Sequence, residues 1–268
     1  MLRLTPTVKN LLLINVAVFI LHQFTPWNIM DVMALRYIGS DAFRPYQFFT
    51  YMFAHSATMF SHILFNMLLL FFMGPLLEGF WGAKRFLTFY IVTGIGAGII
   101  YMGIQYLDIR PFYQQVDNYL EQPQPDSFDL IIAKYAPGAY DDFQTFIDAY
   151  YENPSNDVYI QSSKSYIRDL TKSVDTSLNY GGMVGASGAI YGLIMAIALL
   201  FPNMTFMLIF PPIPVKAKYL ALVLGGIALY SEFNRQEGDF VAHSAHLGGM
   251  VFAFIMIKLW QHKGTTYR

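Results

Sequence analysis

Six long apolar stretches restrict what this chain of 268 residues can fold into. Each is roughly 17–25 residues long, the length of an α-helix that crosses a bilayer. Only 13% of the residues are charged, whereas soluble domains carry about 25%. The sequence therefore predicts an all-α polytopic membrane protein with a bundle of six transmembrane helices. They are expected at residues 8–25, 57–77, 84–106, 184–202, 217–233 and 242–261.

The stretch between the third and fourth predicted helices has a different composition. Residues 108–181 are polar, acidic and rich in Tyr and Asp, and segments 141–154 and 163–178 carry apolar residues at helical spacing. We expect a small water-exposed helical insertion. The predicted organisation is helices 1–3 in residues 1–107, the insertion in 108–181, helices 4–6 in 182–262 and a tail in 263–268. The proline-rich segment 201–219 predicts a non-helical connection.

The distribution of charge predicts the topology. If successive helices alternate in direction, nine of the seventeen basic residues but only one of the eighteen acidic residues, Glu78, share the side of the N-terminus. By the positive-inside rule this side is cytoplasmic. Both termini are then cytoplasmic, and the insertion faces the extracytoplasmic side. The nine basic residues are Arg3, Lys9, Lys84, Arg85, Lys216, Lys218, Lys258, Lys263 and Arg268.

Other sequence features limit the classes of binding partner and the cellular location expected for the protein. A net charge of −1 predicts no nucleic-acid partner, and the chain has no cysteine to form disulfides or thiolate metal sites. The basic start and apolar run resemble a signal peptide, but no small-residue cleavage site follows them, so we expect a retained helix. Without an Arg/Ser-rich transit peptide, a bacterial plasma membrane is the expected location.

The sequence "GASGAIYG", Gly185–Gly192, places a serine between glycines inside an apolar stretch. Small residues of this kind often serve only helix packing. A serine near a helix N-terminus can also act as a nucleophile, because the unpaired N–H groups stabilise negative charge there. Ser187 is therefore a candidate nucleophile, and Tyr191 lies on the same helical face.

A nucleophilic serine needs a base, and the sixth apolar stretch offers His243 and His246. The second stretch offers His62 and Asn66, which are four residues apart and can donate hydrogen bonds to an oxyanion. No acidic residue lies in the six apolar cores, so a dyad is expected rather than a triad. A zinc site formed by the histidines is disfavoured because no acid accompanies them. An aspartyl protease is disfavoured because the only Gly-Asp pair, Gly238-Asp239, lies in a polar loop. We expect no cofactor and no metal.

Close approach of the helices is predicted from small residues. Gly185, Gly188 and Gly192 form one ridge, and Gly249 belongs to another on the sixth stretch. Small residues repeated every four positions let membrane helices pack closely, which a serine–histidine hydrogen bond requires.

Three motifs together resemble the rhomboid intramembrane serine proteases. They are Gly-Ala-Ser-Gly at 185–188, Ala-His-Leu-Gly-Gly at 245–249 and the pair His62 and Asn66. Residues 74–90 are similar to the family's segment between helices 2 and 3, and the resemblance covers roughly residues 1–107 and 182–262. There are two departures: no tryptophan stands beside Arg44, where many members have a Trp-Arg pair, and the insertion is unusually long.

The resemblance implies a role for each of these residues. Ser187 would be the nucleophile and His246 the base, because His246 stands three residues before Gly249. His62, Asn66 and the Ser187 N–H would bind the oxyanion, and Tyr191 would stack on His246. His243 and His55 are expected to be structural, and the segment 231–243 would cover the site as a lid.

The implied activity is cleavage of transmembrane protein substrates near their extracytoplasmic end. The alternative is a non-cleaving rhomboid-like protein that binds or chaperones membrane proteins. A transporter is disfavoured, because the sequence has neither intramembrane charge pairs nor an inverted repeat. The sequence does not name the substrate, the oligomeric state or the insertion's role.

Overall fold

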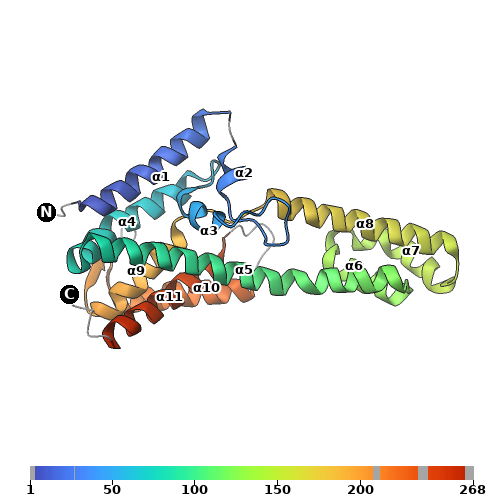
Figure 1. Ribbon diagram of the computed structural model, residues 1–268. Coiled ribbons are helices and arrows are strands. Elements are labelled where there is room, and N and C mark those ends of the chain that lie inside the picture. The colour runs from blue at the N-terminus through green and yellow to red at the C-terminus, as the bar shows by residue number, and fades with distance from the viewer. Residues whose placement is uncertain (1–3, 27, 208–211, 235–240, 263–268) are drawn as a thin grey trace. The chain divides into compact units, whose positions relative to one another are not determined.

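The computed structural model describes residues 4–26, 28–207, 212–234 and 241–262, and this part of the chain is almost wholly helical (Figure 1). It forms two compact units. The first unit contains residues 1–36, 42–103 and 182–268, and the second contains residues 37–41 and 104–181.

Each of the six predicted apolar stretches contains a helix. Within the described residues, α1 (Pro6–Phe24), α4 (Phe60–Trp81) and α5 (Ala83–Glu121) are long and apolar enough to cross a membrane. α9 (Ser187–Leu200) is apolar but has only 14 residues. The last two stretches form α10 (Ala217–Phe233) and α11 (His243–His262), which pack against α9 and against each other.

Short elements occupy the connections of the first unit. α2 (Ile29–Met33), α3 (Gln47–Thr50) and the 3₁₀ helix η1 (Tyr51–Phe53) lie between α1 and α4. The connection from α9 to α10 contains two short antiparallel strands, β1 (Thr205–Met207) and β2 (Pro214–Lys216), in which Phe206 pairs with Val215. The described residues of this connection up to Lys216 are non-helical as predicted, but residues 217–219 of the predicted segment belong to α10. The hairpin was not predicted.

The third helix is longer than the sequence suggests. We predicted that it ends at residue 106 and that the insertion begins at 108, but α5 continues for 39 residues to Glu121 and includes Pro111. At 1.5 Å per residue its length is about 58 Å, about twice the thickness of a bilayer core. A proline lacks one helical N–H, but it does not always end a helix.

Glu78, the single acid predicted on the cytoplasmic side, is buried near the end of α4. Its carboxylate accepts hydrogen bonds from the Thr5 hydroxyl at 2.5 Å and from the N–H groups of Thr7 and Val8 at 3.0 and 2.9 Å. The first N–H groups of a helix have no partner within the helix and favour negative charge. Glu78 therefore caps α1 from a residue 70 positions away in sequence.

The helices of the first unit expose large apolar side chains. Examples are Leu13 of α1, Phe65 of α4, and Leu222 and Phe233 of α10, which are 56%, 61%, 72% and 81% exposed. A helix that is apolar on its outer face is suited to hydrocarbon rather than water. The surface of this unit is therefore consistent with a membrane environment.

The second unit is a small helical module with its own core. The end of α5 is followed by α6 (Pro125–Tyr135), η2 (Pro137–Ala139), α7 (Tyr140–Glu152) and α8 (Asp157–Tyr180). α7 and α8 cover both segments predicted to be helical, whereas α6 was not predicted. The core residues are Phe112, Val116, Tyr119, Phe128, Ile131, Ile132, Ile147, Tyr150 and Ile167.

The tyrosines of this module combine an aromatic ring with a polar tip. Tyr140 and Tyr151 donate hydrogen bonds to the two carboxylate oxygens of Asp129 at 2.7 and 3.2 Å, and Tyr119 donates to Ser163. The hydrogen bond to Asp129, followed by burial, raises the pKa of Tyr140 above its ordinary value. The Tyr- and Asp-rich composition thus has a structural explanation in tyrosine–carboxylate pairs.

Some predictions fall on parts of the chain outside the described residues. These are the tail 263–268, three of the basic residues used for the topology (Arg3, Lys263 and Arg268), and residues 235–240 in the middle of the predicted lid.

Candidate active site

Ser187 is the first residue of α9, at the end of a sharp turn. Gly185 has φ +123°, a conformation that residues with a Cβ rarely adopt. Met183 pairs with Leu35 in an isolated antiparallel bridge, and the Gly185 N–H donates to the carbonyl of Tyr51 at 3.0 Å. The turn and the helix start therefore place the Ser187 hydroxyl beside the unpaired N–H groups of α9.

His246, in the first turn of α11, lies within hydrogen-bond distance of this serine. The distance from His246 Nε2 to Ser187 Oγ is 2.8 Å. His246 is 9% exposed and Ser187 is half-buried, so both groups are largely shielded. This is the geometry that a serine activated by a histidine base requires.

Tyr191 and His246 form the second contact of the site. Their rings stack at a centroid distance of 4.0 Å with an angle of 6° between the planes. The other imidazole nitrogen, His246 Nδ1, is buried and has no hydrogen-bond partner among the residues that the structure describes. The Tyr191 ring, stacked on the face of the imidazole, is therefore the contact that orients His246, and no described acid binds its Nδ1 as in a triad.

The two glycine ridges make only part of the predicted contact. A Cβ at Gly249 would lie 1.9 Å from the Gly188 carbonyl oxygen, so α11 approaches the backbone of α9 at this point. Gly188 and Gly192, however, face α5. A Cβ added at Gly188 would lie 2.5 Å from the Cβ of Ala97, and one added at Gly192 would lie 2.9 Å from the Cβ of Thr93. Gly192 therefore serves packing of α9 on α5 rather than on α11.

His62 lies beside the turn that precedes Ser187. A Cβ at Gly185 would lie 2.6 Å from His62 Nε2 and 3.7 Å from Ser187 Oγ, so the imidazole and the hydroxyl are on the same side of Gly185. The Asn66 side-chain N–H donates to the His62 carbonyl at 2.7 Å, and Asn66 is buried. One N–H of this carboxamide is used within α4, which leaves the other for a ligand.

Two further histidines surround this group. The ring of His243 meets that of His246 edge-on at 6.1 Å, while His246 alone reaches the serine. His55 is 1% exposed, lies 5.1 Å from the ring of His62 and accepts a hydrogen bond from the Ala186 N–H at 3.5 Å. No sequence pattern connects His55 with Ala186, which lies 131 positions away.

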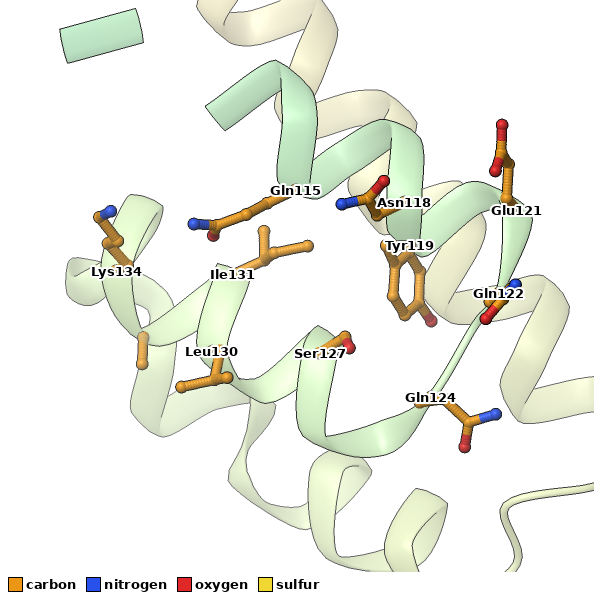
Figure 2. Close-up of a pocket in the computed structure, with 11 residues that line it drawn as sticks. Gln115, Asn118, Tyr119, Glu121, Gln122, Gln124, Ser127, Leu130, Ile131 and Lys134 are labelled. Carbon is orange, nitrogen blue, oxygen red and sulfur yellow. The ribbon is translucent and has the colours of Figure 1, made fainter. Parts of the chain in front are cut away.

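A pocket of about 840 Å³ lies in the second unit, between the end of α5 and α6 (Figure 2). Its lining includes Ser127 but no histidine, so it offers no serine–histidine pair like that of Ser187 and His246. It is lined by Gln115, Asn118, Tyr119, Glu121, Gln122, Gln124, Ser127, Leu130, Ile131, Ala133 and Lys134.

Comparison with protein families gives an independent result. The rhomboid domain matches residues 42–109 and 161–262, which is more than half of the chain and includes Ser187, His246, His62 and Asn66. The match also takes in residues 161–181, which the sequence placed in the insertion. No curated protein matches the chain. The rhomboid domain implies a polytopic helical membrane fold, so this is a multi-pass membrane protein. The chain belongs to the rhomboid family.

Proposed function

We propose that the protein is an intramembrane serine endopeptidase whose catalytic dyad is Ser187 and His246. The observation that supports this best is the 2.8 Å contact between Ser187 Oγ and His246 Nε2, made at the N-terminus of a helix and partly buried. Packing alone would require neither a histidine directed at the hydroxyl nor a tyrosine stacked on the histidine.

The chemistry follows from the positions of the atoms. Ser187 Oγ attacks the carbonyl carbon of the substrate while His246 Nε2 takes the hydroxyl proton. The tetrahedral oxyanion receives hydrogen bonds from the Ser187 N–H, His62 and Asn66. His246 then gives the proton to the leaving amine as the peptide C–N bond breaks. Water, activated by the same imidazole, hydrolyses the acyl-enzyme and restores Ser187.

Substrates are membrane-spanning proteins, because the site is carried by apolar helices within a bilayer. The amides of a substrate helix are occupied by their own hydrogen bonds, so the cleaved segment must unwind first. Residues that destabilise a helix are therefore expected near the cleaved bond. A topology of six crossings, with Ser187 and the insertion on the extracytoplasmic side, is supported by the positive-inside rule. The basic residues on the opposite side include Lys84, Arg85, Lys216 and Lys218.

The test is cleavage of a single-span substrate, with a helix-breaking juxtamembrane segment, by protein reconstituted in liposomes. We expect cleavage by the wild type and its loss in Ser187→Ala and His246→Ala. Ser244→Ala is the matched control, because Ser244 is a buried serine of α11 whose hydroxyl has no hydrogen-bond partner among the residues that the structure describes. Cleavage that survives Ser187→Ala would refute the dyad. Binding of substrate without cleavage by the wild type would favour the non-cleaving alternative.

A further inference from the structure

The turn before Ser187 contains a peptide plane that needs support. Gly185 has φ +123°, and glycine adopts many backbone conformations at little cost. The plane between Gly185 and Ala186 can therefore rotate more easily than one flanked by two ordinary residues. Its orientation affects the next N–H along the chain, that of Ser187, which the proposed mechanism uses.

One segment holds this turn by two hydrogen bonds. Tyr51 O accepts from the Gly185 N–H at 3.0 Å, and His55 Nε2 accepts from the Ala186 N–H at 3.5 Å. The two acceptors are four residues apart, at the start of η1 and just beyond its end. The hydrogen bond to His55 is the one made by the flexible plane itself. At 3.5 Å it is longer than a typical N–H hydrogen bond.

The state of His55 suits this role. An imidazole nitrogen that accepts must carry a lone pair, so the proton of neutral His55 lies on Nδ1. Burial, and secondarily the neighbouring His62, lower the pKa of His55 to about 3. His55 therefore stays neutral over the range in which membrane proteins are assayed, and its Nε2 remains an acceptor.

We propose that His55 is a positioning residue for the oxyanion site: by accepting from the Ala186 N–H and packing against His62, it fixes the Gly185–Ala186 plane and the His62 ring relative to Ser187. It does not touch the substrate or the reacting atoms. This inference rests on the proposed function, because it assigns His55 a role in the reaction of Ser187.

Two polar substitutions separate positioning from packing. In His55→Gln the side-chain oxygen can occupy the place of Nε2 and accept from Ala186, whereas in His55→Asn the shorter side chain reaches only the place of Nδ1. A residue that merely fills space would be replaced about equally well by either. A residue that positions the turn would be replaced by Gln but not by Asn.

The experiment compares wild type, His55→Gln, His55→Asn and Ser187→Ala in the liposome cleavage assay, with thermal unfolding of each. For His55→Asn we expect kcat to fall about 10- to 100-fold with little change in KM, as for a small misplacement of reacting groups. His55→Gln should retain at least about a third of wild-type kcat, and both variants should unfold cooperatively.

The possible results distinguish the two proposals. Equal kcat values for the Gln and Asn variants, with Ser187→Ala inactive, would overturn the positioning role and leave the dyad standing. A fall in kcat matched by an equal fall in the folded fraction would show that His55 is only structural. Cleavage by Ser187→Ala equal to that of the wild type would refute the proposed function and the role of His55 with it.

Discussion

The two units of this protein use helices in opposite ways. In the first, large apolar side chains such as Leu222 and Phe233 are exposed, and the closest helix contacts are made by glycines such as Gly249. In the second, aromatic residues such as Phe128 are buried, and charged residues such as Asp169 and Lys172 are exposed. The first unit also buries large side chains such as Phe86 and Phe89, so the difference lies in its many exposed apolar side chains, which lipid tolerates and water does not.

This difference explains why the catalytic candidates lie in the first unit. Glycine contacts bring α9 and α11 close enough for Ser187 and His246 to meet. In the second unit, polar side chains at the surface form tyrosine–carboxylate pairs. The following substitutions test whether the second unit depends on a large buried side chain and the first on a glycine that lets two helices approach closely.

The largest effect is expected from Phe128→Ala in the second unit. Phe128 is fully buried, and removing a buried aromatic ring costs about 3–5 kcal/mol. Hydrogen exchange in α6, α7 and α8 should become faster, while α9 and α11 remain protected. Equal loss of protection in all five helices would show that the two units do not differ in this way.

Gly249→Ala in the first unit should have the next largest effect. This substitution adds a side-chain atom, whereas Phe128→Ala removes a ring. The added Cβ would lie 1.9 Å from the Gly188 carbonyl oxygen, so the helices must move apart. Overpacking of this kind costs about 1–3 kcal/mol, and separation of Ser187 from His246 should remove most of the cleavage activity. Thermal unfolding and cleavage measure the two effects.

The matched control for Gly249 is Gly226→Ala in α10. No atom lies within 4 Å of a Cβ at Gly226, so this substitution should leave cleavage unchanged. If both glycine variants behave alike, close approach at Gly249 is not what brings the dyad together.

Glu78→Gln should cost about 1–2 kcal/mol, because the N-terminus of α1 loses a charged cap. The glutamine retains one acceptor oxygen for the three donors that Glu78 now serves. The midpoint of thermal unfolding in detergent should fall. Glu152→Gln is the control, since Glu152 is exposed at the end of α7; an equal fall there would contradict the capping role.

The smallest effect concerns alkaline pH. The hydrogen bond to Asp129 raises the pKa of Tyr140 above its ordinary value near 10. Because the pKa of Tyr140 is raised in the folded state, its hydrogen bond to Asp129 stabilises the fold fully below about pH 10. This contribution is lost as the pH rises through the folded-state pKa. Tyrosinate absorbance should show delayed ionisation in the wild type and one fewer late-ionising tyrosine in Tyr140→Phe. An unchanged titration curve would contradict the pairing.

The helices and the dyad were accessible from sequence because they depend on local patterns. Apolar runs of bilayer length predicted six helices, and each contains one in the structure. The motifs around Ser187 and His246 predicted a contact that the structure shows at 2.8 Å. Spacing also identified the face that carries Tyr191. The catalytic roles of these residues stay predictions.

Contacts between residues far apart in the chain were harder to predict from the sequence. A ridge of glycines predicts close packing but not the partner, so the contact of Gly192 with Thr93 of α5 was missed. The polar composition that begins at residue 108 suggested the end of a helix that in fact continues to Glu121. The hydrogen bond between His55 and the Ala186 N–H joins segments far apart in sequence, and no local pattern encodes it.

The most direct test of the dyad is the rate at which a fluorophosphonate probe labels Ser187, located by mass spectrometry, in the wild type and in His246→Ala. If His246 is the base that activates Ser187, removing it should lower the rate by a factor of about 10²–10⁴ while the protein remains folded. Labelling of Ser187 at the same rate in both proteins, or labelling at another serine, would contradict the account.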